Sequence, residues 1–312
     1  MNRIEGRYIS LLTDFGFKRI FGTAINKDLL INFLNSLFEG FQVIKDVKYL
    51  NSEHVGDVFA ERKAIFDVYC ENEKGEKFIV EMQNAYQEFF KDRSLFYTTF
   101  PIREQAEKGS EWDFRLTHVY TVALLNFDMH EESFDADDIC HTVKLCDVKT
   151  NKVFYSKLDF IYVEIAKFDK TEDELVTLYD KWLYVLKNLS RLESRPKVLL
   201  DKVFDRLFEE AEIAKFTPRE LREYEDSRKA YRDLKNSLDT AKREGIAEGM
   251  EKGLAEGLEK GLAEGMEKGR AEERRKALAE KREIALQLLA TGMPAEQVSA
   301  IVGLPMEELK DC

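Results

Sequence analysis

Two short segments of this chain alternate between apolar and other side chains, and a polar stretch separates them. The segments are residues 65–70 (IFDVYC) and 77–83 (KFIVEMQ), with ENEKGE between them. Because successive side chains of an extended strand point to opposite faces, each segment has one apolar face. Six residues would form this face: Phe66, Val68, Cys70, Phe78, Val80 and Met82. The polar stretch contains Gly75, so the pattern predicts a β-hairpin.

The other face of this hairpin carries two acids and an amide. A turn centred near Lys74 places Asp67 directly opposite Glu81, and Gln83 lies on the same face. Directly opposed Cβ atoms are about 4.5–5.5 Å apart, so the two carboxylates would repel each other unless a proton or a cation lay between them. Carboxylate and amide oxygens suit hard cations such as Mg²⁺ and Mn²⁺. The face is therefore a candidate metal site.

A solvated hairpin with a polar outer face is the alternative explanation, and a lone pair of acids in a sequence favours it. Three apolar residues on the same face favour burial instead: Ile65, Tyr69 and Ile79. A buried pair of acids needs a compensating partner. A metal ion would be such a partner.

Several segments, in this order along the chain, resemble a known nuclease family. Asp67, followed on the next strand by Glu81-Met82-Gln83, resembles the D…E-x-Q form of the PD-(D/E)XK nuclease core, in the branch of recombination-promoting nucleases (Rpn) and transposases. Gln83 stands where many members of the superfamily have Lys, a variant that is usual in this branch. The resemblance covers most of residues 1–240. The other similar segments are residues 11–22 (LLTDFGFKRIFG), Arg93-x-x-x-Tyr97, residues 105–109 and residues 120–127.

This resemblance implies a fold and an activity. The fold would be α/β, with a restriction-endonuclease-like core in which helices flank a mixed sheet, and with a helical extension at the C-terminus. The activity would be that of a Mg²⁺-dependent endodeoxyribonuclease, with Mn²⁺ as a substitute ion, that hydrolyses phosphodiester bonds and promotes recombination or transposition. The alternative is a catalytically inactive DNA-binding or assembly protein that keeps the nuclease fold.

The resemblance also implies roles for individual residues. Asp67 and Glu81 would hold the metal ion, and Gln83 would orient the attacking water because an amide cannot act as a base. Asp14, on the first helix, would complete the catalytic site through water. Three residues would contact DNA: Lys18, Arg93 and Tyr97.

Ordinary structural roles compete with some of these assignments. Asp14 suits the start of a helix, and Lys18 suits a solvated helix face. Arg93 shares a helix face with Tyr97 and could contact a phosphate there. An ion pair with Glu88 or Asp92 would explain the arginine without a role in DNA binding.

The spacing of apolar residues predicts the remaining elements. Helical periodicity indicates helices at residues 10–38, 88–108, 175–192 and 198–212, and one that starts at 217 and runs toward 241. Thr171 is expected to cap the helix at 175–192, with Glu174 in the capping-box position. Strands are expected at residues 43–50, 114–128, 143–146 and 158–165.

Beyond residue 240 the sequence changes character. Residues 245–269 repeat a glycine and an apolar residue every four positions, which predicts either a long exposed helix of low intrinsic stability or a flexible spacer. Residues 283–312 resemble a helix-turn-helix module, but the second helix has no Lys or Arg, so a structural or protein-contact role fits equally well. We expect three parts: a nuclease-like domain at 1–240, the repeat at 241–282 and a small helical tail at 283–312. Self-association through the C-terminal helix would be a further property.

Composition narrows the class of protein. With 44% hydrophobic residues the chain is globular, and no apolar run approaches the roughly 20 residues of a membrane span. We therefore expect a soluble, cytoplasmic protein with no membrane partner. The four cysteines have no zinc-binding spacing, so we expect them to be reduced thiols. The net charge of −12 argues mildly against DNA as a partner, which favours basic surfaces.

Overall fold

The computed structural model describes residues 6–54, 64–106 and 113–309. Its contacts divide the chain into two compact units, Met1–Leu238 and Asp239–Cys312.

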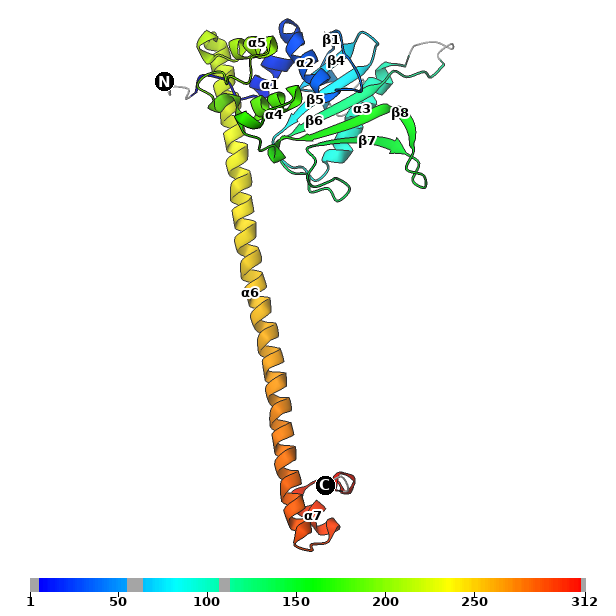
Figure 1. Ribbon diagram of the computed structural model, residues 1–312, viewed down its shortest axis with the longest axis vertical. Coiled ribbons are helices and arrows are strands. Elements are labelled where there is room, and N and C mark those ends of the chain that lie inside the picture. The colour runs from blue at the N-terminus through cyan, green and yellow to red at the C-terminus, as the bar shows by residue number, and fades with distance from the viewer. Residues whose placement is uncertain (1–5, 55–63, 107–112, 310–312) are drawn as a thin grey trace. The chain divides into compact units, whose positions relative to one another are not determined.

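A six-stranded mixed sheet forms the centre of the first unit (Figure 1). Its strand order is β1-β4-β5-β6-β8-β7. Strands β5, β6 and β8 run parallel, while β1, β4 and β7 are antiparallel to their neighbours. The strands are β1 (Val47–Tyr49), β4 (Val68–Asn72), β5 (Lys77–Gln83), β6 (Val119–Leu125), β7 (Cys140–Cys146) and β8 (Val153–Glu164). A separate pair consists of β2 (Glu53–His54) and β3 (Ala64–Ile65).

Helices cover both faces of this sheet, so the α/β fold expected from the sequence is confirmed. On one face the apolar side chains of β4, β5 and β6 pack with four helices: α1 (Asp14–Phe21), α2 (Lys27–Leu37), α4 (Leu178–Asn188) and α5 (Lys202–Glu210). On the other face α3 (Phe90–Glu104) packs against β4, β5 and β6 (Figure 1). The larger core is on the α1 side and is rich in aromatic rings, including Phe17, Phe21, Phe33, Tyr120 and Trp182.

The first helical segment is broken where a continuous helix over residues 10–38 was predicted. α1 ends at Phe21, and α2 follows a 3-10 turn. Thr23 is extended (φ −117°, ψ 139°). The break lets α2 fold back, so that the rings of Phe21 and Phe33 lie 5.4 Å apart in the core. The cap of α1 is Thr13, whose hydroxyl accepts from the backbone N–H of Gly16. Asp14 is therefore the first residue of the helix and not its cap.

The helix predicted from Thr171 starts later than expected. The capping box of Thr171 and Glu174 is present, but it closes only a short 3-10 turn. The backbone becomes extended at Leu175, and α4 begins at Leu178 with a second capping box. This second box joins Thr177 and Asp180. The sequence thus contains two capping boxes six residues apart. The helix starts at the second one, and its buried residues follow from there.

The strand predicted at residues 65–70 is also interrupted. β3 ends at Ile65 and β4 begins at Val68. The backbone N–H of Phe66 donates to the carbonyl of Ser52, and the Phe66 ring packs with Tyr69 and Ile79 on the α3 side of the sheet. Phe66 was predicted on the opposite face, with Val68. The prediction was wrong because it assumed one continuous strand.

The long helix α6 (Pro218–Ala290) starts in the first unit and continues through the glycine repeat in the second. The repeat is thus helical, and the helix predicted to run toward 241 does not end there. After it come α7 (Ala295–Val302) and α8 (Met306–Leu309). Ile301 is an apolar residue of α7, but 63% of it is exposed. The small core of this tail consists of Ala285, Val298, Val302, Leu304 and Leu309.

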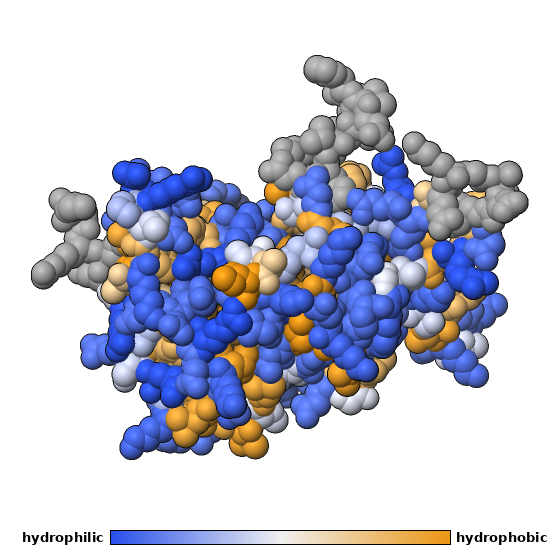
Figure 2. Space-filling model, turned by 90° about the horizontal axis from the view of Figure 1, so that it is seen from above, coloured by the Kyte–Doolittle hydropathy of each residue, from blue (hydrophilic) through white to orange (hydrophobic). Residues whose placement is uncertain are grey.

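The surface agrees with the high proportion of charged residues. On the face seen from above, hydrophobic side chains form small patches that hydrophilic ones separate (Figure 2). Within the described residues, no helix combines the length and the apolar character that a membrane span requires.

Candidate functional site

The hairpin of β4 and β5 has the register that its turn predicts. Val68 pairs with Val80, and Gly75 in the turn adopts φ +75°. Asp67 directly precedes β4, and Glu81 directly follows Val80 on β5. The backbone N–H of Asp67 donates to Oε1 of Glu81 over 3.2 Å, and Oδ2 of Asp67 accepts from the backbone N–H of Met82 over 2.8 Å. These two hydrogen bonds therefore hold the two acids next to each other across the hairpin.

Gln83 lies on the same side as this pair. Its Nε2 donates to Oε2 of Glu81 over 3.2 Å. The amide is thus held against the carboxylate. Because one strand carries both residues two positions apart, their side chains leave the sheet in the same direction.

Burial makes this acid pair unfavourable in its charged form. Only 6% of Glu81 is exposed, which excludes a solvated outer face for this residue. Burial, together with the nearby Asp67 carboxylate, raises the pKa of Glu81 to about 8. Burial also raises the pKa of Asp67, against the hydrogen bond from Met82 and the charge of Lys18. The pair therefore holds a proton near neutral pH unless a cation replaces it.

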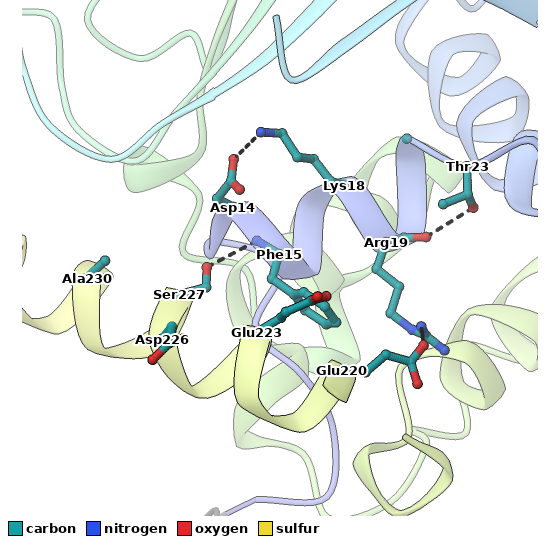
Figure 3. Close-up of a pocket in the computed structure, with 11 residues that line it drawn as sticks. Asp14, Phe15, Lys18, Arg19, Thr23, Glu220, Glu223, Asp226, Ser227 and Ala230 are labelled. Atoms are coloured by element: carbon teal, nitrogen blue, oxygen red, sulfur yellow. Dashed lines mark hydrogen bonds and ion pairs between the residues drawn. The ribbon is translucent and has the colours of Figure 1, made fainter. Parts of the chain in front are cut away.

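The first helix brings a lysine and a third acid to this pair. Nζ of Lys18 lies 2.6 Å from Asp14 and 3.7 Å from Oδ1 of Asp67. Burial opposes the charge of Lys18, but the carboxylates of Asp14 and Asp67 more than offset this and raise its pKa. Figure 3 shows Lys18 and Asp14 side by side on α1. Asp14 thus reaches the acid pair through an ammonium group.

A cavity of about 810 Å³ adjoins Asp14 and Lys18 between α1 and the first turns of α6. Its walls include Phe15, whose backbone N–H donates to the hydroxyl of Ser227 over 3.1 Å (Figure 3). Acidic residues from α6 also line it: Glu220, Glu223 and Asp226. Lys18 thus lines this cavity and also lies beside Asp67.

Arg93 and Tyr97 lie on α3. Nη1 of Arg93 donates to Oε1 of Gln87 over 2.6 Å, and the guanidinium lies 5.7 Å from the centre of the Tyr97 ring. Within the described residues, no ion pair links Arg93 to Glu88 or Asp92, so that structural explanation is wrong. The ring of Tyr97 packs edge-on against Phe66 at 5.2 Å.

Both α3 residues lie within electrostatic reach of the acid pair. The charge of Arg93 opposes the rise in the pKa of Glu81 that burial causes. Burial and the Glu81 carboxylate raise the pKa of Tyr97. Lys18 on α1 and Arg93 on α3 therefore both act electrostatically on the acid pair.

The donor set fits a hard divalent cation bound through few protein ligands. Within the described residues, no group of three or more His, Cys, Asp or Glu side chains has the geometry of a metal site. Mg²⁺, however, is commonly held by one or two carboxylates and keeps several waters for substrate phosphates. Asp67 and Glu81 supply two such carboxylates. A cation would offset the burial that raises both pKa values and the Asp67 charge that further raises the pKa of Glu81.

Sequence reasoning missed a polar network at the edge of this site. Nδ2 of Asn84 donates to the carbonyl of Leu12 over 2.7 Å, and Nδ2 of Asn126 donates to Oδ1 of Asn84 over 3.3 Å and to the hydroxyl of Tyr231 over 3.2 Å. Asn84 and Asn126 directly follow β5 and β6. These strands are parallel, with Gln83 opposite Leu125, so the asparagines that follow them lie side by side. An asparagine directly after each of two apolar strands was the signal in the sequence that could have predicted this network.

A comparison with models of protein families identifies the family of this chain. A model described as "PD-(D/E)XK nuclease family transposase" matches residues 11–241. The chain therefore belongs to the PD-(D/E)XK nuclease family of transposases. Neither the curated proteins nor the solved structures contain a match to this chain.

Proposed function

We propose that this protein is a metal-dependent DNA endonuclease that promotes recombination or transposition. The observation that supports this most is the buried pair of Asp67 and Glu81, with Gln83 bonded to it and Lys18 beside it. Family membership makes the chain a nuclease-type protein, and the pair supplies what a cation-dependent phosphodiesterase needs. Mg²⁺ is the proposed ion, with Mn²⁺ as a substitute.

Each residue has a proposed task that follows from its contacts. Asp67 and Glu81 would hold the ion, which when bound lowers the pKa of a water and neutralises developing charge. Gln83 donates to Glu81 through Nε2, which leaves its amide oxygen to accept a hydrogen bond, and this oxygen would orient the attacking water. Lys18 would contact a backbone phosphate while Asp14 holds its ammonium group.

A plasmid-nicking assay tests the proposal directly. We expect the wild-type protein to nick supercoiled DNA in Mg²⁺ but not in EDTA. Asp67→Ala should reduce the rate by a factor of about 10³ or more, because charge stabilisation of this kind contributes several kcal/mol. Asp226→Ala, an acid of the neighbouring cavity, is the matched control and should nick like the wild type. A folded Asp67→Ala protein with near wild-type nicking would refute the proposed site.

The competing function is a catalytically inactive DNA-binding or assembly protein. The exposed apolar residues along the repeat of α6, such as Leu254 at 76% and Leu258 at 64%, are the observation in its favour. Self-association through α6 would cover them. This alternative predicts DNA binding that is equal with and without Mg²⁺, no nicking, and a mass in solution above that of one chain.

A further inference from the structure

One face of α3 carries a row of exposed aromatic rings around an arginine. Phe89, Arg93 and Phe96 are spaced four and three residues apart and so share one helix face. Phe89 is 66% exposed and Phe96 is 43% exposed. With Gln87, Glu88 and Asp92 they line a pocket of about 470 Å³, which is within the range of small-molecule sites. Exposed rings beside an arginine are the usual elements of a base-stacking surface.

The arginine at the centre of this row is held in place but is not fully bonded. Its guanidinium lies 5.2 Å from the centre of the Phe90 ring, and Nη1 donates to Gln87. Nη2 is buried and has no acceptor within the described residues. A buried donor without an acceptor costs about 1–3 kcal/mol. Arg93 thus forms part of the pocket wall and has one enclosed donor without an acceptor.

The charges at the rim select bases over phosphates. Glu88 and Asp92 are exposed at the pocket, and their carboxylates would repel a phosphate. They would, however, accept hydrogen bonds from the exocyclic amine of a base, as acids do from cytosine. The whole chain carries a net charge of −12. Stacking on aromatic rings provides affinity for nucleic acid that does not depend on a basic surface.

We propose that this α3 pocket binds an unpaired DNA base that carries an exocyclic amine, such as cytosine, so that the substrate is single-stranded or locally opened DNA. In a duplex the base faces are stacked on each other and cannot reach Phe89 or Phe96. Arg93, which lines the pocket, also acts electrostatically on Glu81, so the pocket and the acid pair have one charged residue in common. The inference rests on the proposed nuclease function for its biological meaning, but its binding test does not.

The test measures binding of the full-length protein in EDTA, where no cleavage occurs. The probes are fluorescent oligo-dC, oligo-dT of equal length, and the corresponding duplex. We expect oligo-dC to bind about tenfold more tightly than either of the others, with a weak dependence on salt. Phe96→Ala should weaken oligo-dC binding about tenfold or more, and Phe96→Trp should preserve it. Phe154→Ala, an 83% exposed ring on β8, is the matched control and should change nothing.

Two results would overturn the inference: equal binding of all three probes, or wild-type binding of oligo-dC by a folded Phe96→Ala protein. If either result is found while the wild-type protein nicks plasmid in Mg²⁺, the pocket proposal fails and the nuclease proposal stands. If oligo-dC binding depends on Phe96 but no nicking occurs, the pocket proposal stands and the nuclease proposal fails.

Discussion

The hairpin acids and the glycine repeat are both conspicuous in the sequence, but the structure treats them in opposite ways. Backbone N–H groups hold both acids: that of Asp67 donates to Glu81, and that of Met82 donates to Asp67. Lys18 on α1 lies beside Asp67. In the repeat, no atom outside the local helix lies within 4 Å of where a Cβ at Gly249 or Gly257 would be. A pattern in the sequence can therefore mark either a site built by tertiary contacts or a purely local structure.

Two glycines illustrate the difference at the level of single atoms. At Gly16, in α1, an added Cβ would lie 2.1 Å from the carbonyl oxygen of Ser10. At Gly257 it would meet open space. The first glycine is required by packing, whereas the second only lowers the helix propensity of α6.

The largest effect concerns the pH dependence of the metal-free protein. Burial raises the pKa of Glu81 to about 8, whereas an unfolded glutamate titrates near 4.3. Between these values the folded state keeps a proton that the unfolded state has lost, so the free energy of unfolding falls as the pH rises toward 8. At about 1.4 kcal/mol per pKa unit, the loss is of the order of several kcal/mol. Urea unfolding at a series of pH values measures it.

Mg²⁺ and one substitution should remove this dependence. Mg²⁺ at pH 8 should restore stability and release a proton, because the cation replaces it between the acids. Glu81→Gln, which mimics the protonated side chain, should flatten the pH profile of the metal-free protein. Glu256→Gln, an exposed glutamate of the repeat, is the matched control. A wild-type profile that is flat from pH 5 to 8 would contradict the burial of this pair.

A smaller effect is expected from replacing the two contrasting glycines. Gly16→Ala should destabilise the first unit by about 1–3 kcal/mol, because the added methyl group overlaps backbone that cannot move away. Gly257→Ala should stabilise α6 locally by up to about 1 kcal/mol. Thermal unfolding followed by circular dichroism measures both changes. If Gly257→Ala lowered the stability, as Gly16→Ala is expected to do, the repeat would be packed against other atoms.

The smallest effect should follow from removing the repeat and the tail. We propose that residues 1–240 form an autonomous nuclease-like domain, with 241–282 as a helical connector and 283–312 as a small tail. A protein truncated after Ala241 should then melt cooperatively near the wild-type temperature and nick plasmid at the wild-type rate. Aggregation of the truncated protein, or loss of its Mg²⁺-dependent nicking, would show that the domain needs the later residues.

The sequence by itself determined the features that depend on local periodicity. The alternation on either side of Gly75 fixed the hairpin and its register, because a slip of one residue would turn every apolar side chain of β5 to the wrong face. The same alternation placed Glu81 and Gln83 on one side. It also predicted a mixed sheet with helices, since strands and helices follow each other in the order of an α/β fold.

Only the tertiary structure decided which distant residues join the acid pair. Lys18 reaches Asp67 because α1 packs on the hairpin, and the two residues are separated by nearly fifty positions with no periodic signal between them. The turn of Phe66 toward α3 likewise depends on a backbone hydrogen bond to Ser52 and on the rings of Tyr69 and Tyr97. Periodicity encodes the face of an element, whereas contacts between elements depend on how those faces pack.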